Sequence, residues 1–369
     1  MPTKTLKPSK ENTLPEVKMP IYDIHKTWTE NAIEGPFFNG EIPSRKILPE
    51  SQWTDFLGYR VASPLGVPSG PLLNSRWIAL AARLGFDIVA YKTMRSHPSP
   101  SHPLPNVIFV EPIPGQPQVA METARPKKTS EITITNSFGN PSMPPEFLLQ
   151  DIAKARSSLQ KGQVLIVSVF GVEGHSGGVA QDFVKAAEIA KAGGAHIIEA
   201  NFSCPNVHTK EGALFCDPES SYHIASLLAK AAAPLPLLIK VGRYPNRELL
   251  SKVLTALSKA NVRGVCGINT ISMKVINRDN APALGKDRET SGVCGNFIRP
   301  MALDFLKTAR EIISKERLDL ELAGCGGIMQ PEHFDEFLST GAVAAMSATG
   351  MMWDPYLAIK WHQQKEKER

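Results

Sequence analysis

Four asparagines and one cysteine are the side chains whose types and positions best suit chemistry. Asn136, Asn201, Asn206 and Asn269 fall at positions that we expect to share one rim of the fold, although asparagine is uncommon in strands. Each carboxamide offers two donors and an acceptor, so the four suit a substrate rich in amide-like N–H and C=O groups. Turn and cap chemistry is the alternative, and it fits Asn206 best. Cys204, in the same segment as Asn201 and Asn206, suits a nucleophile, a proton acceptor or a small buried side chain.

Two lysines end buried apolar runs. Lys92 follows 87–91, and Lys240 closes 235–240. A buried ammonium is unfavourable unless a negative partner balances it. Two such groups at one mouth suit an electron-rich cofactor, such as a reduced flavin. A lysine whose charged head reaches solvent is the alternative, and it explains one of them more easily than both.

Glycine-rich turns follow the last two strand candidates. GCGG at 324–327 and ATG at 348–350 each open a helical pattern. Backbone N–H groups at a helix start bind phosphate, and the turns after strands 7 and 8 of a (β/α)8 barrel form its usual phosphate site. Ordinary tight turns are the alternative interpretation.

Short apolar runs and amphipathic helical patterns alternate along the chain and must position these residues. Nearly continuous apolar strands, each followed by a helix, favour a parallel sheet covered by helices. Eight of them favour a closed (β/α)8 TIM barrel, whose functional end lies at the C-terminal ends of the strands. No GxGxxG follows the first strand, which weakens the Rossmann alternative. Ser75 is expected to cap the first helix. The strand candidates are 64–67, 87–91, 164–169, 196–201, 235–240, 264–269, 320–324 and 342–347, and the helical patterns are 77–84, 145–160, 180–192, 222–233, 246–260, 299–315 and 332–340.

Composition excludes several classes of protein. The chain has 369 residues, 42% hydrophobic and 21% charged, which are ordinary globular proportions. A net charge of +5 is too small to indicate nucleic-acid binding without a clustered patch. No run approaches the about 18 apolar residues of a membrane helix, and the N-terminus lacks the apolar core of a signal peptide, so we expect a cytoplasmic protein. Five cysteines without a C-x-x-C pair argue for reduced thiols and against a thiolate-bound metal site.

Most of the 30 prolines lie in two stretches. Residues 1–52 are polar and weakly periodic, so we expect an N-terminal extension with a loose docking segment around 28–38. The stretch at about 96–131 is strand-poor and too long for an ordinary connection, which predicts a long inserted lid loop. The expected organisation is therefore this extension followed by one barrel domain at 53–369 that carries the insertion.

Seven segments together resemble the dihydroorotate dehydrogenase family. The similarity is collinear from residue 54 to about 360, which makes it far more specific than any single motif. The cysteine of ANFSCPN is similar to the soluble class 1 enzymes, whereas the membrane-associated, quinone-using class carries serine there. The segments are YKT (91–93), TNSFGNPS (135–142), ANFSCPN (200–206), LIKVG (238–242), GINTIS (267–272), SGVCGNFIRP (291–300) and GCGGI (324–328).

The resemblance implies an FMN-dependent oxidation of (S)-dihydroorotate to orotate in pyrimidine biosynthesis. Cys204 would be the base that removes the C5 proton, while a hydride passes from C6 to flavin N5. The FMN phosphate would lie on Gly326, Gly327 and Thr349, and Lys240 would face the N1–O2 edge of the ring. The other implied cofactor contacts are Ser69, Gly70, Lys92, Thr93, Asn201, Thr270 and Gly292. The implied substrate contacts are Lys92, Asn136, Phe138, Gly139, Asn140, Asn201, Asn206, Asn269 and Thr270.

Partners follow from the same resemblance. It implies a soluble electron acceptor such as fumarate and a homodimer, and we expect no metal, nucleic-acid or membrane partner. A separate electron-transfer subunit also fits. The chain departs from the class 1 pattern at Asn106, which stands where a basic lid residue is usual, and at Ser142, Cys294 and Ala348.

Other functions remain open on sequence. Thr270 and the loop GALFCDP (212–218) also resemble dihydropyrimidine dehydrogenase-like domains, which reduce uracil or thymine but usually carry histidine in place of Asn206. A degenerate, non-catalytic flavin-binding barrel is a second alternative, motivated by Cys294 and the lid. An RNA-directed flavin reductase would need a basic appendage larger than the tail KEKER.

Overall fold

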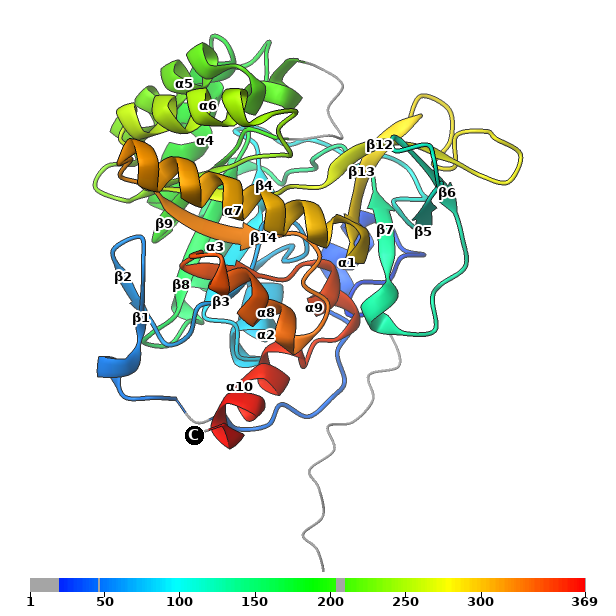
Figure 1. The fold of residues 1–369 in the computed structure, drawn as a ribbon, viewed down its shortest axis with the longest axis horizontal. Helices are drawn as coiled ribbons and strands as arrows, with labels where there is room; N and C mark the ends of the chain where they lie inside the picture. The colour runs from blue at the N-terminus through cyan, green and yellow to red at the C-terminus, as the bar shows by residue number, and fades with distance from the viewer. Residues whose placement is uncertain (1–19, 46, 204–209, 369) are drawn as a thin grey trace, which may run out of the picture.

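The computed structural model describes residues 20–45, 47–203 and 210–368, and its centre is a closed barrel of eight strands (Figure 1). Every strand pairs in parallel with both neighbours. The predicted (β/α)8 barrel is confirmed, and each of the eight strand candidates overlaps one barrel strand. In order around the barrel, the strands are β3 (Leu65–Val67), β4 (Ile88–Met94), β8 (Val164–Val169), β9 (Ile197–Asn201), β10 (Leu237–Lys240), β11 (Gly264–Gly267), β14 (Glu321–Cys325) and β15 (Ala344–Met346).

The barrel interior changes from apolar to polar along its height. Alternate strand residues face inward, and the lower ones, such as Ile88, Val164 and Ile197, form one apolar cluster. The hairpin of β1 (Thr54–Phe56) and β2 (Tyr59–Val61) packs against that cluster. The next inward positions, toward the C-terminal ends of the strands, carry buried polar side chains, which we call the polar layer. The polar layer consists of Lys92, Ser168, Glu199, Asn201 and Lys240.

Helices cover the outer face of the barrel. Asn74, whose side chain accepts from the Arg76 N–H, caps α2, so the prediction of Ser75 as the cap is wrong by one residue. The Ser75 hydroxyl instead donates to Asp151 at 2.6 Å. The helix after β9 begins four residues before its predicted start, because the Asp217 carboxylate accepts two N–H groups of its first turn. The helices are α2 (Ser75–Arg83), α3 (Pro145–Ser157), α4 (Val179–Ala192), α5 (Pro218–Ala232), α6 (Arg247–Lys259), α7 (Arg299–Glu316), α8 (Pro331–Ser339), α9 (Thr349–Trp353) and α10 (Leu357–Lys367), with short 3-10 helices at Glu50–Gln52, Thr129–Glu131, Lys210–Cys216 and Asn296–Ile298.

A second sheet stands beside the C-terminal ends of the barrel strands (Figure 1). The expectation of a strand-poor lid loop at 96–131 is wrong, because two strands of this sheet lie within it. The prolines of this stretch lie at the ends of the two strands and in the turn between them. The run from Val107 to Val110 therefore keeps its backbone N–H groups and can pair with neighbouring strands. The sheet consists of β5 (Val107–Pro112), β6 (Val119–Glu122), β7 (Thr133–Asn136), β12 (Ile271–Ile276) and β13 (Thr290–Gly295).

The described part of the N-terminal extension packs tightly onto the barrel, so the expectation of a loose segment is also wrong. Thr27 and Glu30 form a capping box that starts α1 (Trp28–Glu34). Ile21 and Trp28 are buried in the main apolar core. The Ile21 N–H donates to the Met352 carbonyl at 3.0 Å, which joins the two ends of the described chain.

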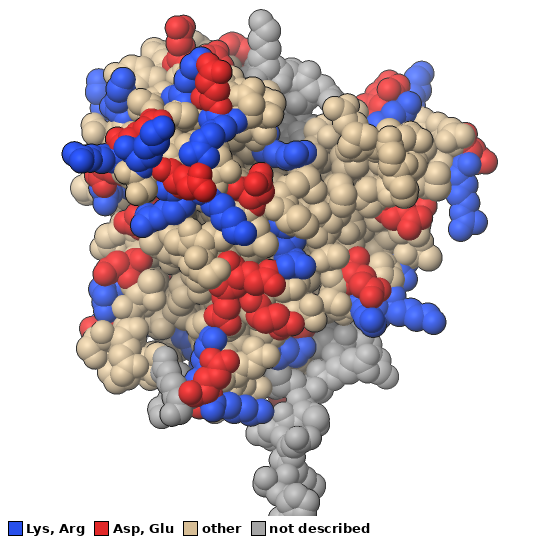
Figure 2. All heavy atoms as spheres, in the orientation of Figure 1, with Lys and Arg blue, Asp and Glu red and all other residues tan. Residues whose placement is uncertain are grey.

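Charged side chains of both signs are interspersed on the face drawn in Figure 2. Ion pairs such as Arg247–Glu311 (2.6 Å) and Arg263–Asp319 (2.7 Å) join exposed side chains of opposite charge. Such surface pairs contribute little to stability. Figure 2 shows no continuous basic patch on the face that it draws. Among the described residues, no helix is long and apolar enough to cross a membrane.

The lowered pKa values of two histidines predict that the folded state becomes less stable in acid. Burial and a nearby arginine lower the pKa of His196 and of His362 from 6.5 to about 4. In the unfolded chain both imidazoles bind protons below about 6.5, while the folded chain resists protonation until about 4. The free energy of unfolding is therefore expected to fall as pH drops from 6.5 to 4.

Urea unfolding at pH 7.5 and pH 5 measures this loss. His196→Gln should flatten the dependence, whereas His223→Gln, at an exposed position of α5, should leave it unchanged. An equally steep acid loss in the His196 variant would rule out this origin.

Candidate active site

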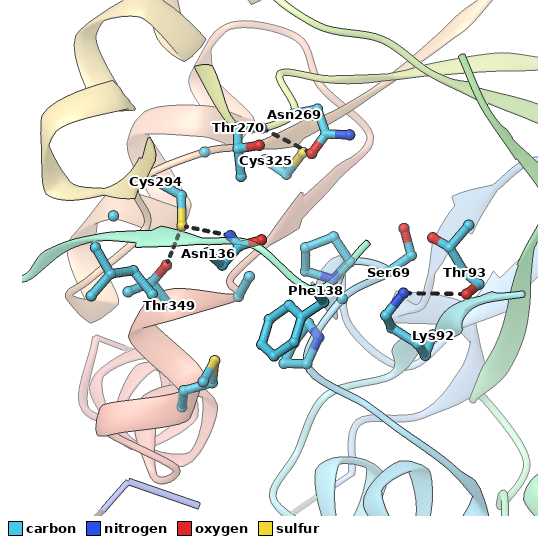
Figure 3. Close-up of a pocket in the computed structure, with 18 of the residues that line it drawn as sticks. Ser69, Lys92, Thr93, Asn136, Phe138, Asn269, Thr270, Cys294, Cys325 and Thr349 are labelled. Carbon is cyan, nitrogen blue, oxygen red and sulfur yellow. Dashed lines mark hydrogen bonds between the residues drawn. The ribbon is translucent and has the colours of Figure 1, made fainter. Parts of the chain in front are cut away.

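One pocket covers the C-terminal ends of the barrel strands and reaches the second sheet and the N-terminal segment. It encloses about 1140 Å³ of space not filled by atoms, its open mouth included. Most of the residues expected at the site line this one pocket (Figure 3). They are Ser69, Gly70, Lys92, Thr93, Asn136, Phe138, Asn140, Asn201, Lys240, Asn269, Thr270, Gly326, Gly327 and Thr349.

Two lysines of the polar layer lie at the pocket floor. Lys240 is 3% exposed and Lys92 is 9% exposed. Lys92 Nζ donates to the Thr93 carbonyl at 3.2 Å and to Asn140 Oδ1 at 3.0 Å (Figure 3 shows the first contact). Burial disfavours the charged form of Lys240, but Cys325 and Glu199 outweigh this and raise the pKa of the ammonium above its usual value. The floor therefore presents positive charge to whatever occupies the pocket.

The turns after β14 and β15 line one side of the pocket with glycine-rich backbone, as an anion cradle would require. Gly326 and Gly327 have φ of +119° and +85°, and a Cβ on Gly327 would lie 2.6 Å from Arg299 Cβ. Glycine is thus required for this turn to leave its backbone facing the cavity. Thr349 begins α9 beside it. Its hydroxyl and the Asn136 carboxamide both donate to Cys294 Sγ, at 3.5 and 3.6 Å (Figure 3).

Three of the four predicted asparagines come together at the pocket rim. Asn269 Nδ2 donates to Asn201 Oδ1 at 3.3 Å and to the Ser203 carbonyl. The Asn269 side-chain oxygen accepts from the Thr270 N–H at 2.8 Å, and Asn136 reaches the same pocket from β7. Asn206 and Cys204 lie outside the described residues.

The loop after β7 carries a side-chain amide that lacks a hydrogen-bond partner among the described residues. Asn140 has a left-handed backbone (φ +54°) and is 5% exposed, and its Nδ2 has no hydrogen-bond partner among the described residues. Arg95 fixes the loop by donating to the carbonyls of Gly139 and Asn140 at 2.9 and 3.0 Å. Asn106, expected at a flexible lid, is instead buried and donates to three backbone carbonyls of this region.

Two predicted residues are absent from the described pocket wall. Gly139 faces the loop before β5, where an added Cβ would lie 2.5 Å from His102 Nε2. Gly292 pairs with Asn136 within the second sheet. No group of three or more metal-binding side chains occurs in the described ranges.

The structure also adds wall residues that sequence reasoning missed. Tyr22 and Trp28 come from the N-terminal segment, and the polar atom of each is buried without a hydrogen-bond partner among the described residues. The capping-box spacing of Thr27 and Glu30 was the available signal for the helix that begins at Trp28. Cys294 and Cys325 also line the pocket, the latter with its sulfur 3.6 Å from that of Cys266.

Comparisons with known proteins agree over most of the chain. The family model described as Dihydroorotate dehydrogenase matches residues 52–366. A Dictyostelium discoideum protein named dihydroorotate dehydrogenase is 46% identical over 361 residues, which cover 94% of this chain and 97% of the relative. Dihydroorotate dehydrogenase A (fumarate) of Limosilactobacillus reuteri is 31% identical over 181 residues, 48% of this chain and 56% of its own. The dihydroorotate dehydrogenase B (NAD(+)) catalytic subunit of Bacillus pumilus is 30% identical over 187 residues, 49% of this chain and 56% of its own.

Proposed function

This chain belongs to the dihydroorotate dehydrogenase family, and from that premise we propose that it oxidises (S)-dihydroorotate to orotate with FMN as its cofactor. The observation that carries the proposal is one pocket that joins an anion cradle, two buried lysines and an amide rim. Each part matches a different portion of the proposed ligands. The enzyme is accordingly an oxidoreductase that acts on a CH–CH group.

The residues present fit FMN. Gly326, Gly327 and Thr349 offer a phosphate cradle at the positions where (β/α)8 barrels usually bind one. Lys240 would face the electron-rich edge of the ring from the floor, and Ser69 and Gly70 leave room for a flat ring against the end of β3. When bound, FMN supplies the acceptor for a hydride.

The amide rim fits a dihydropyrimidine carboxylate. The unpartnered Asn140 Nδ2 and the Lys92 ammonium offer donors on one side of the pocket, which suits the carboxylate. Asn136, Asn201 and Asn269 offer the alternating donors and acceptors that ring N–H and C=O groups need. We assign Asn206 to the same set from its motif.

Proton removal is assigned to Cys204. The C5 proton of dihydroorotate is alpha to a carbonyl, so a base of modest strength suffices when it is held close to the carbon. Residues 201–203 bring the chain to the rim immediately before this cysteine, and the Asn269 side chain ties down the Ser203 carbonyl. The assignment of Cys204 rests on its position in the motif, directly after these residues.

The wider role follows from the same proposal. A dihydroorotate oxidase acts in pyrimidine biosynthesis. We propose a soluble acceptor such as fumarate, in keeping with the name of the L. reuteri relative, and a homodimer in the cytoplasm. The described cysteines 216, 266, 294 and 325 are free thiols, which agrees with a reducing compartment.

Anaerobic titration of the FMN-loaded protein tests the substrate. Dihydroorotate is expected to bleach the flavin absorbance near stoichiometry, and fumarate to restore it. Uracil and thymine should leave photoreduced enzyme unchanged. Reoxidation by uracil would transfer the activity to dihydropyrimidine dehydrogenase-like chemistry, and no response to any of these compounds would leave only a flavin-binding barrel.

A further inference from the structure

Glu199 is a buried carboxylate that the proposed reaction does not use. It lies on β9 with 0% of its surface exposed, and the Ser69 hydroxyl donates to its Oε1 at 2.6 Å. Its Oε2 has no hydrogen-bond partner within the described ranges. Removing an ionised carboxylate from water is unfavourable unless an opposite charge balances it, so the burial of Glu199 requires a structural or functional explanation.

Lys240 supplies the opposite charge from the neighbouring strand. In the parallel pair of β9 and β10, Glu199 lies opposite Leu238 and Asn201 lies opposite Lys240. Leu238 belongs to the interior cluster, so Glu199 and Lys240 both point into the barrel from adjacent strands. In this register the backbone of Glu199 lies one inward step before that of Lys240 along the strands.

The other titratable groups that face Lys240 are thiols. Cys266 of β11 and Cys325 of β14 lie beside it. The hydrogen bond with Cys325, together with burial, raises the pKa of the Cys266 thiol. The hydrogen bond with Cys266 lowers the pKa of the Cys325 thiol, so Cys325 acts on Lys240 together with Glu199. Glu199 is the one carboxylate among the described groups that act on Lys240. The remaining described titratable groups of the pocket wall are Tyr22, Lys92 and Cys294.

From this arrangement we infer that Glu199 is a positioning residue, which keeps Lys240 as an ammonium facing the cofactor edge while Ser69 holds the carboxylate in place. This role rests on the proposed binding of FMN. It differs from a packing role, because it acts through the charge on another residue and therefore depends on pH.

Removing the Glu199 charge should make Lys240 titrate. Burial lowers the pKa of an unpaired lysine by as much as 3–5 units, which brings it toward neutrality. In Glu199→Gln, Lys240 would then be charged at pH 6 and neutral at pH 9. The contact between the ammonium and the FMN ring would be lost as pH rises through that interval.

The test measures FMN affinity of cofactor-stripped protein by quenching of flavin fluorescence between pH 6 and pH 9. We expect wild-type affinity to vary less than threefold. Glu199→Gln should bind FMN roughly tenfold more weakly at pH 9 than at pH 6, the value of about one charge-assisted hydrogen bond. Glu199→Asp keeps the charge and should restore the flat profile.

A double-substitution cycle separates this role from packing. In a Lys240→Met background, Glu199→Gln should leave affinity unchanged or increase it, because it removes a carboxylate that has lost its partner. An equal loss in both backgrounds, or a pH-independent loss in Glu199→Gln, would overturn the inference while FMN binding stands. If Glu199→Gln does not fold, FMN affinity is measured against pH in Ser69→Ala and Glu199→Asp instead. An FMN affinity that falls as pH rises in Glu199→Asp would refute the role. Failure of the wild-type chain to bind FMN would instead remove the cofactor assignment itself.

Discussion

Replacing Cys204 with alanine is expected to slow reduction of the bound flavin by dihydroorotate roughly 10²- to 10⁴-fold, the usual contribution of a positioned general base. The rim asparagines would still hold the substrate, so its dissociation constant should change little. The residue before Cys204 lies at the site, because Ser203 is 3% exposed and its carbonyl accepts from the Asn269 side chain.

Anaerobic stopped-flow measurement of the first turnover isolates this step. In the wild-type chain the rate should rise with pH as the thiolate forms, and a free thiol titrates near about 8.5. The alanine variant should lose that rise. Cys216→Ala is the matched control, since this half-buried thiol ends the 3-10 helix Lys210–Cys216 and lies outside the pocket wall. Rapid, pH-dependent reduction in Cys204→Ala would remove this cysteine from the mechanism.

The second large effect is expected at Lys92. Lys92→Met should weaken orotate binding roughly a hundredfold, because it removes a buried charge-assisted contact to the carboxylate. The loss should be greater than a truncated rim asparagine would give, since the methionine also leaves Asn140 Oδ1 without the 3.0 Å bond from Lys92.

A ligand comparison provides the control for this variant. The perturbation of the flavin spectrum reports dissociation constants for orotate and for uracil, which lacks the carboxylate. Orotate affinity should fall while the weak affinity for uracil stays nearly constant. A parallel loss for both ligands would show that Lys92 supports the pocket or the cofactor rather than the carboxylate.

The barrel could be predicted because its strands are buried on both faces. The run 164–169 is apolar except for Ser168, and its bounds in the structure match the prediction. The second sheet could not be predicted in the same way, because β6 pairs with β12, more than 150 residues away, and prolines surround it. Its strands are set by these distant partners rather than by local pattern.

The residues of the site also differ in whether the sequence could predict them. Residues at strand ends, such as Lys92, Asn201 and Lys240, were predictable because the barrel topology gathers those ends at one mouth. Glu199 was not predicted, because a strand that is apolar on both faces hides which positions turn inward. Tyr22 and Trp28 were missed because their place at the pocket depends on how the N-terminal segment docks.

Because of that docking, the pocket wall depends on segments that are far apart in the sequence. Its wall includes Tyr22 and Trp28 from the beginning of the chain and Met352 from near its end, and the Ile21–Met352 hydrogen bond ties the two. A nascent or prematurely ended chain therefore cannot complete the wall, however well its central strands fold. A ligand that contacts this wall would stabilise the docked arrangement of both segments, because it binds the folded chain and not the unfolded one.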